Sequence, residues 1–215
     1  MANLDGRVTS AAAIVLAGGR SSRMGRPKAL LPFAGEPLLV HVVRTVRSVV
    51  DEVVVVASPD QQLPDVPALI VRDGVAFQGP VAGLTYGLEA LSAKVAYVTS
   101  CDAVFLDPRV MRLVLARIEG HDAAVPVWNG RLQPLHAAWR RTVLPHLGER
   151  LAAGDLRLTD VLDAVRAQRI DEREVREIDP EGWSFFNMNT PEDYERALQL
   201  WPRLRGDASA PSDRC

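Results

Sequence analysis

Residues 11–28 read AAAIVLAGGRSSRMGRPK, a short apolar run that leads through two glycines into a basic loop. The run has the length and composition of a β-strand covered on both faces, as strands of parallel sheets are. Four cations follow within nine residues, and no Asp or Glu lies between Gly6 and Gly35 to neutralise them. Because uncompensated like charge at short range is unfavourable, we expect this loop to bind a small anion.

The residue types in the loop suit a polyphosphate. Gly18 and Gly19 have no side chains, so the backbone N–H groups there can approach phosphate oxygens. Arg20, Arg23 and Lys28 can then neutralise a triphosphate, and we expect the loop to face solvent. The loop matches neither the Walker sequence nor the GxGxxG fingerprint. A tight turn with solvated arginines is the alternative, and the unopposed charge favours phosphate.

The rest of the first half alternates between strand and helix patterns. The expected strands are 11–17, 53–58, 68–71 and 95–100, and the expected helices are 37–50, 79–91 and 107–118. Pro37 and Pro108 suit the first turns of two of these helices, and Asp107 suits a cap. This alternation predicts an α/β fold of three layers, a Rossmann-like, mostly parallel central sheet with helices on both faces.

The second half is less regular. We expect strands at 123–127 and 133–139 around an Asn129-Gly130 turn, and helices at 143–153, 159–167 and 190–201. Residues 169–178 alternate in strand fashion, although their charges also permit a helix. Thr190 suits the cap of the last helix. With no repeat or interior linker, we expect one domain over 1–202 and a flexible C-terminal tail over 203–215.

Composition excludes several classes of protein. The chain has 215 residues, 47% of them apolar, and a net charge of −2, which argues against a general nucleic-acid binder. Two cysteines make no disulfide framework, which is typical of the reducing cytoplasm. The run SAAAIVLAGG resembles a signal-peptide core but lacks a strongly basic leader, so we interpret it as a strand. No apolar stretch has the length of a membrane span.

Two carboxylates lie where expected strands end, which is the edge where open α/β sheets bind ligands. Asp102 follows a buried strand, where a carboxylate is costly unless it is paired or binds a metal, and one carboxylate beside phosphates is a typical Mg²⁺ arrangement. A loop or capping role is the alternative. Asp73 could bind a nucleotide hydroxyl, or it could form a turn before Gly74.

Polar residues in the second half are harder to assign. Asn187 and Asn189 flank Met188, so on a strand their side chains would share one face and could bind metal or substrate. They could instead serve the turn into the last helix. We interpret His136 as a satisfied core histidine and Cys101 as packing rather than a nucleophile.

Taken together, these motifs resemble the MobA family, the molybdenum cofactor guanylyltransferases. The resemblance covers most of the chain. It is carried by LAGGRSSRMG with Lys28, RDGVAFQGPVAGL (72–84), SCD (100–102), RLQPLHAAW (131–139) and FFNMNTPEDY (185–194). The first motif belongs to a wider class of nucleotidyltransferases, whereas QPLHA and FNMNTPED are more particular to MobA.

The resemblance implies transfer of GMP from GTP to the terminal phosphate of Mo-molybdopterin, with pyrophosphate released and Mg²⁺ as cofactor. It also implies transient contacts with other cofactor-biosynthesis or acceptor proteins. The resemblance also implies roles for the matching positions. The nucleotide would contact Leu16, Ala17 and Gly18 and would also bind Asp73, and its phosphates would be held by Gly19, Arg20 and Arg23. Lys28 would stabilise charge at the α-phosphate, Asp102 would bind Mg²⁺ and phosphates, and Asn187 and Asn189 would face the pterin or metal. Arg23, Lys28 and Asp102 are the implied catalytic residues.

The chain departs from the family pattern at two places. Val56, with Ser58 nearby, stands where the family has an Asn that holds the nucleotide. Ala103 and Val104 follow Asp102, where the family has Thr or Met and then Pro. The alternatives are a MocA-like cytidylyltransferase, another small-molecule nucleotidyltransferase, or a non-catalytic nucleotide-binding adaptor. QPLHA favours guanylyl over cytidylyl transfer, and Asp102 argues against the adaptor.

Overall fold

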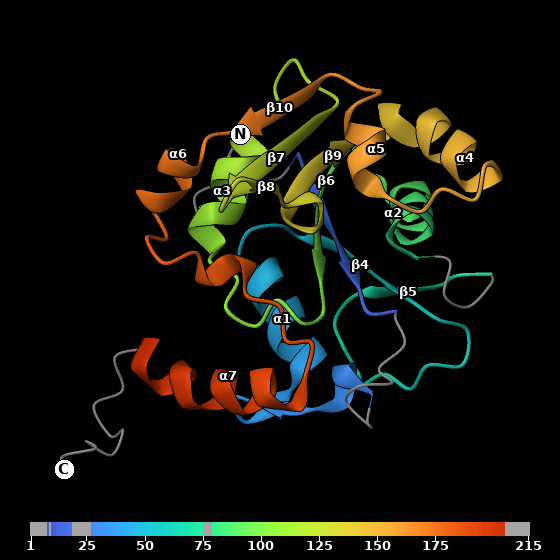
Figure 1. The fold of residues 1–215 in the computed structure, drawn as a ribbon. Coiled ribbons are helices and arrows are strands. Elements are labelled where there is room, and N and C mark those ends of the chain that lie inside the picture. Colours follow the sequence, from blue (N-terminus) through green and yellow to red (C-terminus); the bar gives the residue numbers. More distant parts are fainter. Residues whose placement is uncertain (1–7, 9, 19–26, 75–78, 205–215) are drawn as a thin grey trace, which may run out of the picture.

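The structure is a computed structural model that describes residues 8, 10–18, 27–74 and 79–204 (Figure 1). Its central sheet has the strand order β10-β7-β9-β6-β1-β4-β5, with β8 paired to β7 beside this path. The strands are β1 (Ala12–Leu16), β4 (Glu52–Ala57), β5 (Leu69–Arg72), β6 (Val95–Ser100), β7 (Ala123–Trp128), β8 (Arg131–Leu132), β9 (Ala137–Arg140) and β10 (Ala167–Ile170).

The sheet is mixed and mostly parallel, which confirms the expected fold class. Strands β5, β4, β1 and β6 run parallel, and so do β7 and β10. The strand β9 is antiparallel to both of its neighbours, β6 and β7. Because the chain extends the sheet from β1 in opposite directions, first through β4 and later through β6, the strand order reverses at β1. Ligands of open α/β sheets bind at such a reversal.

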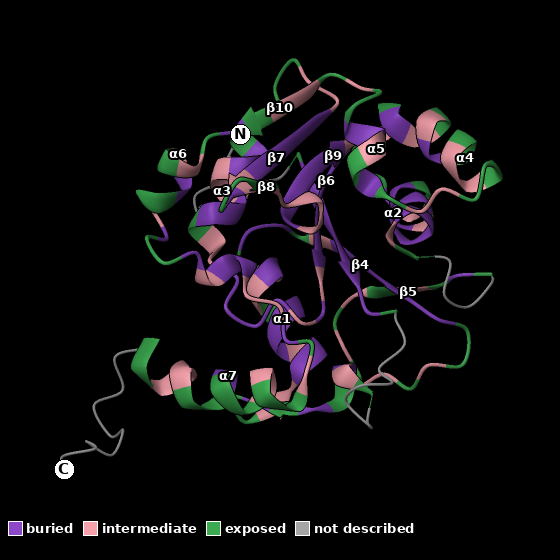
Figure 2. Cartoon of the chain, in the orientation of Figure 1, coloured by how far each residue is buried: buried purple, intermediate pink, exposed green. Residues whose placement is uncertain are grey.

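Helices cover both faces of the sheet (Figures 1 and 2). One face packs against α1 (Leu38–Arg47), α3 (Pro108–Ala116) and α6 (Glu172–Arg176), and the other against α2 (Gly79–Ala90), α4 (Leu144–Ala152) and α5 (Leu158–Leu162). A third apolar cluster joins α7 (Pro191–Leu204) to the hairpin of β2 (Pro32–Phe33) and β3 (Glu36–Pro37). Among the described residues, no helix has the length and apolar character needed to cross a membrane.

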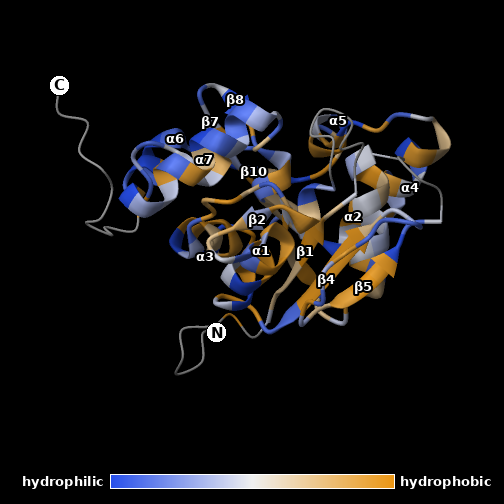
Figure 3. Cartoon of the chain, turned by 90° about the horizontal axis from the view of Figure 1, so that it is seen from below, coloured by the Kyte–Doolittle hydropathy of each residue, from blue (hydrophilic) through white to orange (hydrophobic). Residues whose placement is uncertain are grey.

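Hydropathy follows this layering. Figure 3 shows β1, β4 and β5 as hydrophobic strands, whereas much of α6 and α7 is hydrophilic. All five residues of β1 are buried, so this strand has the uniformly apolar character that its sequence predicts. The short 3₁₀ turns are η2 (Lys28–Leu30), η3 (Pro134–His136), η4 (Arg141–Val143) and η5 (Trp183–Phe185).

In the second half, the expected strand at 133–139 is wrong in part, and residues 169–178, whose sequence permits both a strand and a helix, contain some of each. Residues 133–136 are not strand: Pro134 begins η3, because its fixed φ and missing N–H suit a tight turn, and only residues from Ala137 join the sheet. Residues 169–178 divide at Asp171. This side chain accepts a hydrogen bond from the Arg173 N–H and caps α6, so only the first two residues of that range lie in β10.

The helix signals were more accurate than the strand signals. Asp107 caps α3 by accepting from the Arg109 N–H at 2.7 Å, and Thr190 and Asp193 form reciprocal capping bonds at the start of α7. Pro37, in contrast, is extended and lies just before α1 rather than in its first turn. The helix α5 ends five residues earlier than expected. The boundary expected at 202 falls inside α7, and 205–215 lie outside the described residues.

The helix α2 packs with its backbone directly against β1. A Cβ at Gly87 would lie 2.7 Å from Cδ1 and Cγ2 of Ile14, and a Cβ at Gly83 would lie 2.8 Å from Cδ2 of Leu16. Both distances are shorter than real Cβ contacts, so a larger residue at either position would require Ile14 or Leu16 to shift. The close packing sets the start of α2 beside the carboxyl end of β1.

Replacing Gly87 by Ala should therefore destabilise the protein by about 1–3 kcal/mol, because the new methyl group overpacks Ile14. Gly148, in α4, has open space around its Cβ position. Gly148→Ala should stabilise by about 0.5–1 kcal/mol through helix propensity alone. Urea denaturation of both variants checks the pair, and a Gly87→Ala variant as stable as the wild type would contradict the described packing.

Candidate functional site

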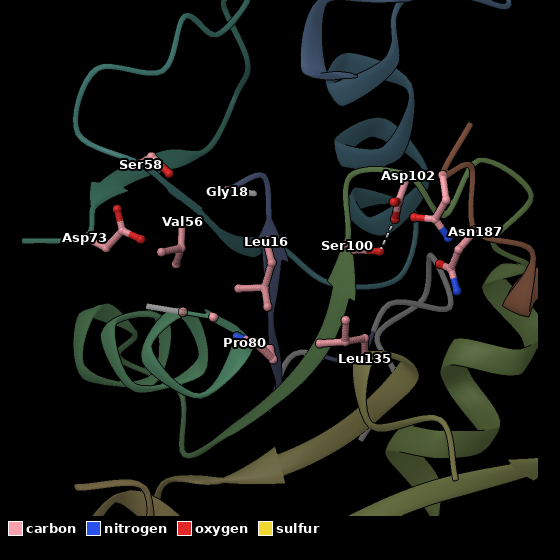
Figure 4. A pocket seen from close by; sticks show the side chains of 13 residues that line it. Leu16, Gly18, Val56, Ser58, Asp73, Pro80, Ser100, Asp102, Leu135 and Asn187 are labelled. Carbon is pink, nitrogen blue, oxygen red and sulfur yellow. Dashed lines mark hydrogen bonds between the residues drawn. The ribbon is translucent and has the colours of Figure 1, made fainter. Parts of the chain in front are cut away.

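A pocket of about 670 Å³ opens at the carboxyl edge of β1, β4 and β6 (Figure 4). It is lined by Leu16, Gly18, Val56, Ser58, Asp73, Gly79, Pro80, Gly83, Ser100, Asp102, Leu135, Asn187 and Asn189. Figure 4 shows Val56, Ser58 and Asp73 on one side of Leu16, with Ser100, Asp102 and Asn187 on the other. The pocket therefore has two sides that meet at the end of β1.

Strand register explains why residues distant in sequence meet here. Leu16 is paired with Val56 in β4 and with Ser100 in β6, so the three strands end level with one another. The residues two positions after Leu16, Val56 and Ser100 therefore lie at the same edge of the sheet. These residues are Gly18, Ser58 and Asp102.

An ion pair between Lys28 and Asp102 lies on the Asn187 side of the pocket. The Lys28 Nζ is 2.7 Å from Asp102 Oδ2, and it also donates to Asn189 Oδ1 at 3.3 Å. The hydroxyl of Ser100 donates to the other oxygen of Asp102. The side chains of Lys28 and Asp102 are only 17% and 13% exposed, so the expectation of a solvent-facing Lys28 is wrong. Asp102, which lines the pocket, holds Lys28 beside it.

Backbone contacts hold Asp102 at the strand end. The N–H of Cys101, the residue before it, donates to the Leu16 carbonyl at 3.0 Å and so continues the pairing with β1. Two residues after Asp102, the Val104 carbonyl accepts from Nε2 of the buried His41 at 2.9 Å. Arg44 donates to Nδ1 of His41 at 3.3 Å, which suits the neutral tautomer with its proton on Nε2.

Ala103 and Val104, which stand where the family has Thr or Met and then Pro, are both buried. Both side chains are 1% exposed, and Val104 belongs to the apolar cluster beneath α7. The loop is therefore anchored by apolar packing and by the His41 bond where the family pattern has a proline. Cys101 is buried too, and burial, with help from Asp102, raises the pKa of its thiol to about 12, so it packs as expected.

The wall on the β4 side is built around Gln61, which the sequence did not single out. Its amide Nε2 donates to the Ala17 carbonyl at 2.8 Å, and its Oε1 accepts from the Ser58 N–H at 3.4 Å. A Cβ on Gly18 would lie 3.4 Å from Ser58 Oγ, so the two segments lie in van der Waals contact. Ala17 is buried behind the wall, whereas Leu16 and Gly18 line it.

Asp73 ends this side of the pocket. It is 8% exposed, and its Oδ1 has no hydrogen-bond partner among the described residues. Burial raises the pKa of its carboxyl group, although the Asp73 N–H and Arg72 oppose the effect. The expected alternative, a turn former before Gly74, does not explain a desolvated carboxylate on a pocket wall. A ligand with N–H or O–H donors would satisfy it.

The opposite side of the pocket is formed by the segment before α7. Asn187 and Asn189 both line the pocket, whereas Met188 between them is fully buried. The expected shared face is confirmed, although the segment is irregular rather than strand. Asn187 Nδ2 donates to the Phe185 carbonyl at 3.3 Å, and Leu135 of η3 completes this side.

His136 lies in the core as expected, with 1% of its surface exposed, but it is not satisfied. Neither ring nitrogen has a hydrogen-bond partner among the described residues. Burial lowers the pKa of His136 to about 4, against the opposing influence of Asp102 and the Asn187 side chain. The histidine is therefore neutral at physiological pH.

The donors around Asp102 suit Mg²⁺. Asp102 and the amides of Asn187 and Asn189 line the pocket, with the second carboxylate, Asp73, on the other side of Leu16, and hard oxygen ligands of this kind are those that Mg²⁺ binds. No group of three or more His, Cys, Asp or Glu side chains gathers anywhere in the described parts of the chain. A cation here would therefore take further ligands from water and from a bound phosphate. The implied phosphate ligands Gly19, Arg20 and Arg23 lie outside the described residues.

The chain is similar to proteins of one family over most of its length. The family model described as the MobA-like NTP transferase domain matches residues 13–170. A probable molybdenum cofactor guanylyltransferase of Carboxydothermus hydrogenoformans is 30% identical over 191 residues, which cover 87% of this chain and 94% of that protein. A molybdenum cofactor guanylyltransferase of Desulfosudis oleivorans is 33% identical, with 86% and 92% covered.

A solved structure shares the fold. It is that of molybdopterin-guanine dinucleotide biosynthesis protein A from Archaeoglobus fulgidus, with a TM-score of 0.75 and 24% sequence identity. The match covers 90% of this chain and 99% of that one.

Removing Lys28 tests its ion pair with Asp102. Lys28→Ala should lower the free energy of unfolding by about 1–2 kcal/mol, because Asp102 would keep a largely buried charge without its cation. Urea denaturation at constant ionic strength measures the change, and Lys94→Ala, at an exposed lysine, is the control. Equal stabilities of the two variants would show that the pair contributes nothing.

Proposed function

The chain belongs to the MobA-like NTP transferase family, and we propose that it transfers GMP from GTP to the terminal phosphate of Mo-molybdopterin, releasing pyrophosphate. The supporting observation is the position of the Lys28–Asp102 pair. Asp102 lies on the same side of Leu16 as Asn187, whereas Asp73 lies on the other side (Figure 4). Such a pocket can hold two substrates with the reacting phosphates between them.

Phosphate chemistry is assigned to the Lys28–Asp102 pair. Lys28 would donate to oxygens of the α-phosphate, where charge develops during transfer, and Asp102 would hold Mg²⁺ and, through the cation, the nucleotide phosphates. When bound, Mg²⁺ neutralises phosphate charge and orients the pyrophosphate leaving group. We assign further phosphate contacts to Gly19, Arg20 and Arg23.

The nucleophile is an oxygen of the acceptor's terminal phosphate. A phosphate monoester is ionised at neutral pH, so it needs no general base on the protein. What the protein supplies is alignment of the attacking oxygen with the α-phosphorus. Ser100 holds one oxygen of Asp102 while Lys28 contacts the other, so the carboxylate is oriented before substrates bind. Asn189, which accepts from Lys28, joins this pair to the acceptor side.

The base of the nucleotide is assigned to the side of Val56, Ser58 and Asp73. A carboxylate there can accept from both N1–H and the 2-amino group of guanine, two neighbouring donors on one edge. Cytosine offers only its 4-amino donor on the equivalent edge, next to an acceptor. The desolvated Asp73 therefore favours guanine, and the Val56 side chain supplies an apolar surface for the ring.

A nucleotide panel tests the reaction. We expect the wild-type protein with molybdopterin and Mg²⁺ to release pyrophosphate with GTP and to release little with ATP, CTP or UTP. Asp102→Asn should reduce the rate at least about 100-fold, since it removes the charge that holds the cation. Lys94→Ala is the control. Release with CTP alone would contradict guanylyl transfer and favour a cytidylyltransferase.

Asp73→Asn tests the assignment of the base. The amide keeps the shape of the side chain but replaces one acceptor by a donor, which opposes the guanine 2-amino group or N1–H. We expect kcat/KM for GTP to fall about 10- to 100-fold relative to the values for ATP, CTP and UTP. The value of kcat at saturating GTP should be less affected. The circular dichroism melting temperature of the variant controls for folding. An unchanged preference for GTP would place the base elsewhere.

A further inference from the structure

The imidazole of His136 is a buried group that the proposed reaction does not use. It lies in η3, directly behind the pocket wall, because the preceding residue, Leu135, lines the pocket. Both its ring nitrogens are buried and have no partner among the described residues. Burying a polar atom without a hydrogen bond costs about 1–3 kcal/mol. A side chain that only filled the core would avoid this cost, so the histidine requires an explanation.

Several groups face His136. In the antiparallel pairing of β6 with β9, Val98 lies opposite Ala137, so the next pair of positions beyond the end of β9 is Thr99 and His136. The Thr99 hydroxyl is also buried and has no partner among the described residues. The ring of Phe185 meets the imidazole edge-on, with centroids 5.3 Å apart. Phe185 links His136 to Asn187, since its ring meets the imidazole and its carbonyl accepts from Asn187. Asp102 and the Asn187 side chain both raise the pKa of His136 against the effect of burial, although the contact with Asn187 does not meet the geometry of a hydrogen bond.

Asn187 is the neighbour that connects His136 to the pocket. It lines the pocket and donates one amide N–H to the Phe185 carbonyl, through a bond of 3.3 Å that fixes one side of the amide. The amide also has an oxygen acceptor and a second N–H. A neutral imidazole can donate one N–H to that oxygen, and the second amide N–H is then left for a ligand in the pocket.

We propose that His136 is a positioning residue for the acceptor substrate, which orients the Asn187 amide by donating a ring N–H to its oxygen when the acceptor phosphate binds. Bonds of this kind are commonly long in a protein without substrate and shorten in the complex. The oriented amide donates its second N–H to the phosphate of the acceptor. This role rests on the proposed function, because it takes the side of Asn187 and Asn189 as the acceptor side.

The proposal predicts opposite effects on stability and on acceptor binding. His136→Leu removes both unpartnered nitrogens at similar volume, so the melting temperature should stay the same or rise. The same change should weaken binding of molybdopterin about tenfold, the loss expected for one hydrogen bond. Because the nucleotide lies at the other side of the pocket, binding of GTP should be unchanged.

The experiment measures binding of molybdopterin and of GTP, separately, to the full-length protein, together with KM for each substrate and the melting temperature. His136→Asn keeps a nitrogen near the position of Nδ1 and His136→Gln near that of Nε2. We expect one of them to restore acceptor binding and thereby to identify the donating nitrogen. His146→Leu, at an exposed histidine of α4, is the matched control.

A selective loss of molybdopterin binding in His136→Leu, with unchanged GTP binding and an undiminished melting temperature, would support the positioning role. Unchanged molybdopterin binding would overturn it, and so would equal losses for both ligands with a lower melting temperature, which indicate a structural role. A wild-type protein that binds GTP but no molybdopterin would overturn the proposed acceptor and this inference together.

Discussion

The ion pair of Lys28 and Asp102 is the interaction around which the site is organised. It joins the end of the glycine-containing loop after β1 to the end of β6, across the reversal of strand order. Because both side chains are largely buried, each charge depends on the other or on a bound ligand that replaces it. In the proposed reaction a metal bound by Asp102 and a triphosphate bound by Lys28 would provide such replacements. Each charge would then keep an opposite charge beside it when substrates bind.

The fold brings this pair together by simple means. Strands β1, β4 and β6 end level because their registers align Leu16 with Val56 and with Ser100. Glycines in α2 let that helix lie against β1, which brings the start of α2 to the pocket without filling it. Apolar packing of the loop after Asp102, together with the His41 bond to Val104, then fixes the carboxylate. The polar side chains of the site are thus held in place by rigid apolar packing.

Sequence predicted the parallel half of the fold and most of the polar residues that line the pocket, because uniformly apolar strands and capped helices have strong local signals. It failed where a turn or a cap interrupts a strand-like pattern and where tertiary contacts decide. Pro134 turns the chain out of the sheet, and Asp171 converts a strand-like alternation into a helix start. The burial of Lys28 depends on Asp102, 74 residues away, and nothing local indicates it. Gln61 and the unpartnered nitrogens of His136 could likewise be found only from the packed structure.

The central claim is that Asp102 couples the nucleotide to a divalent cation. Titration calorimetry of GTP binding, with and without Mg²⁺ and in the absence of acceptor, tests it most directly in the wild type and in Asp102→Asn. We expect Mg²⁺ to tighten GTP binding to the wild type and to have little effect on the variant. The same gain from Mg²⁺ in both proteins would contradict this claim, because the cation would then be bound without Asp102.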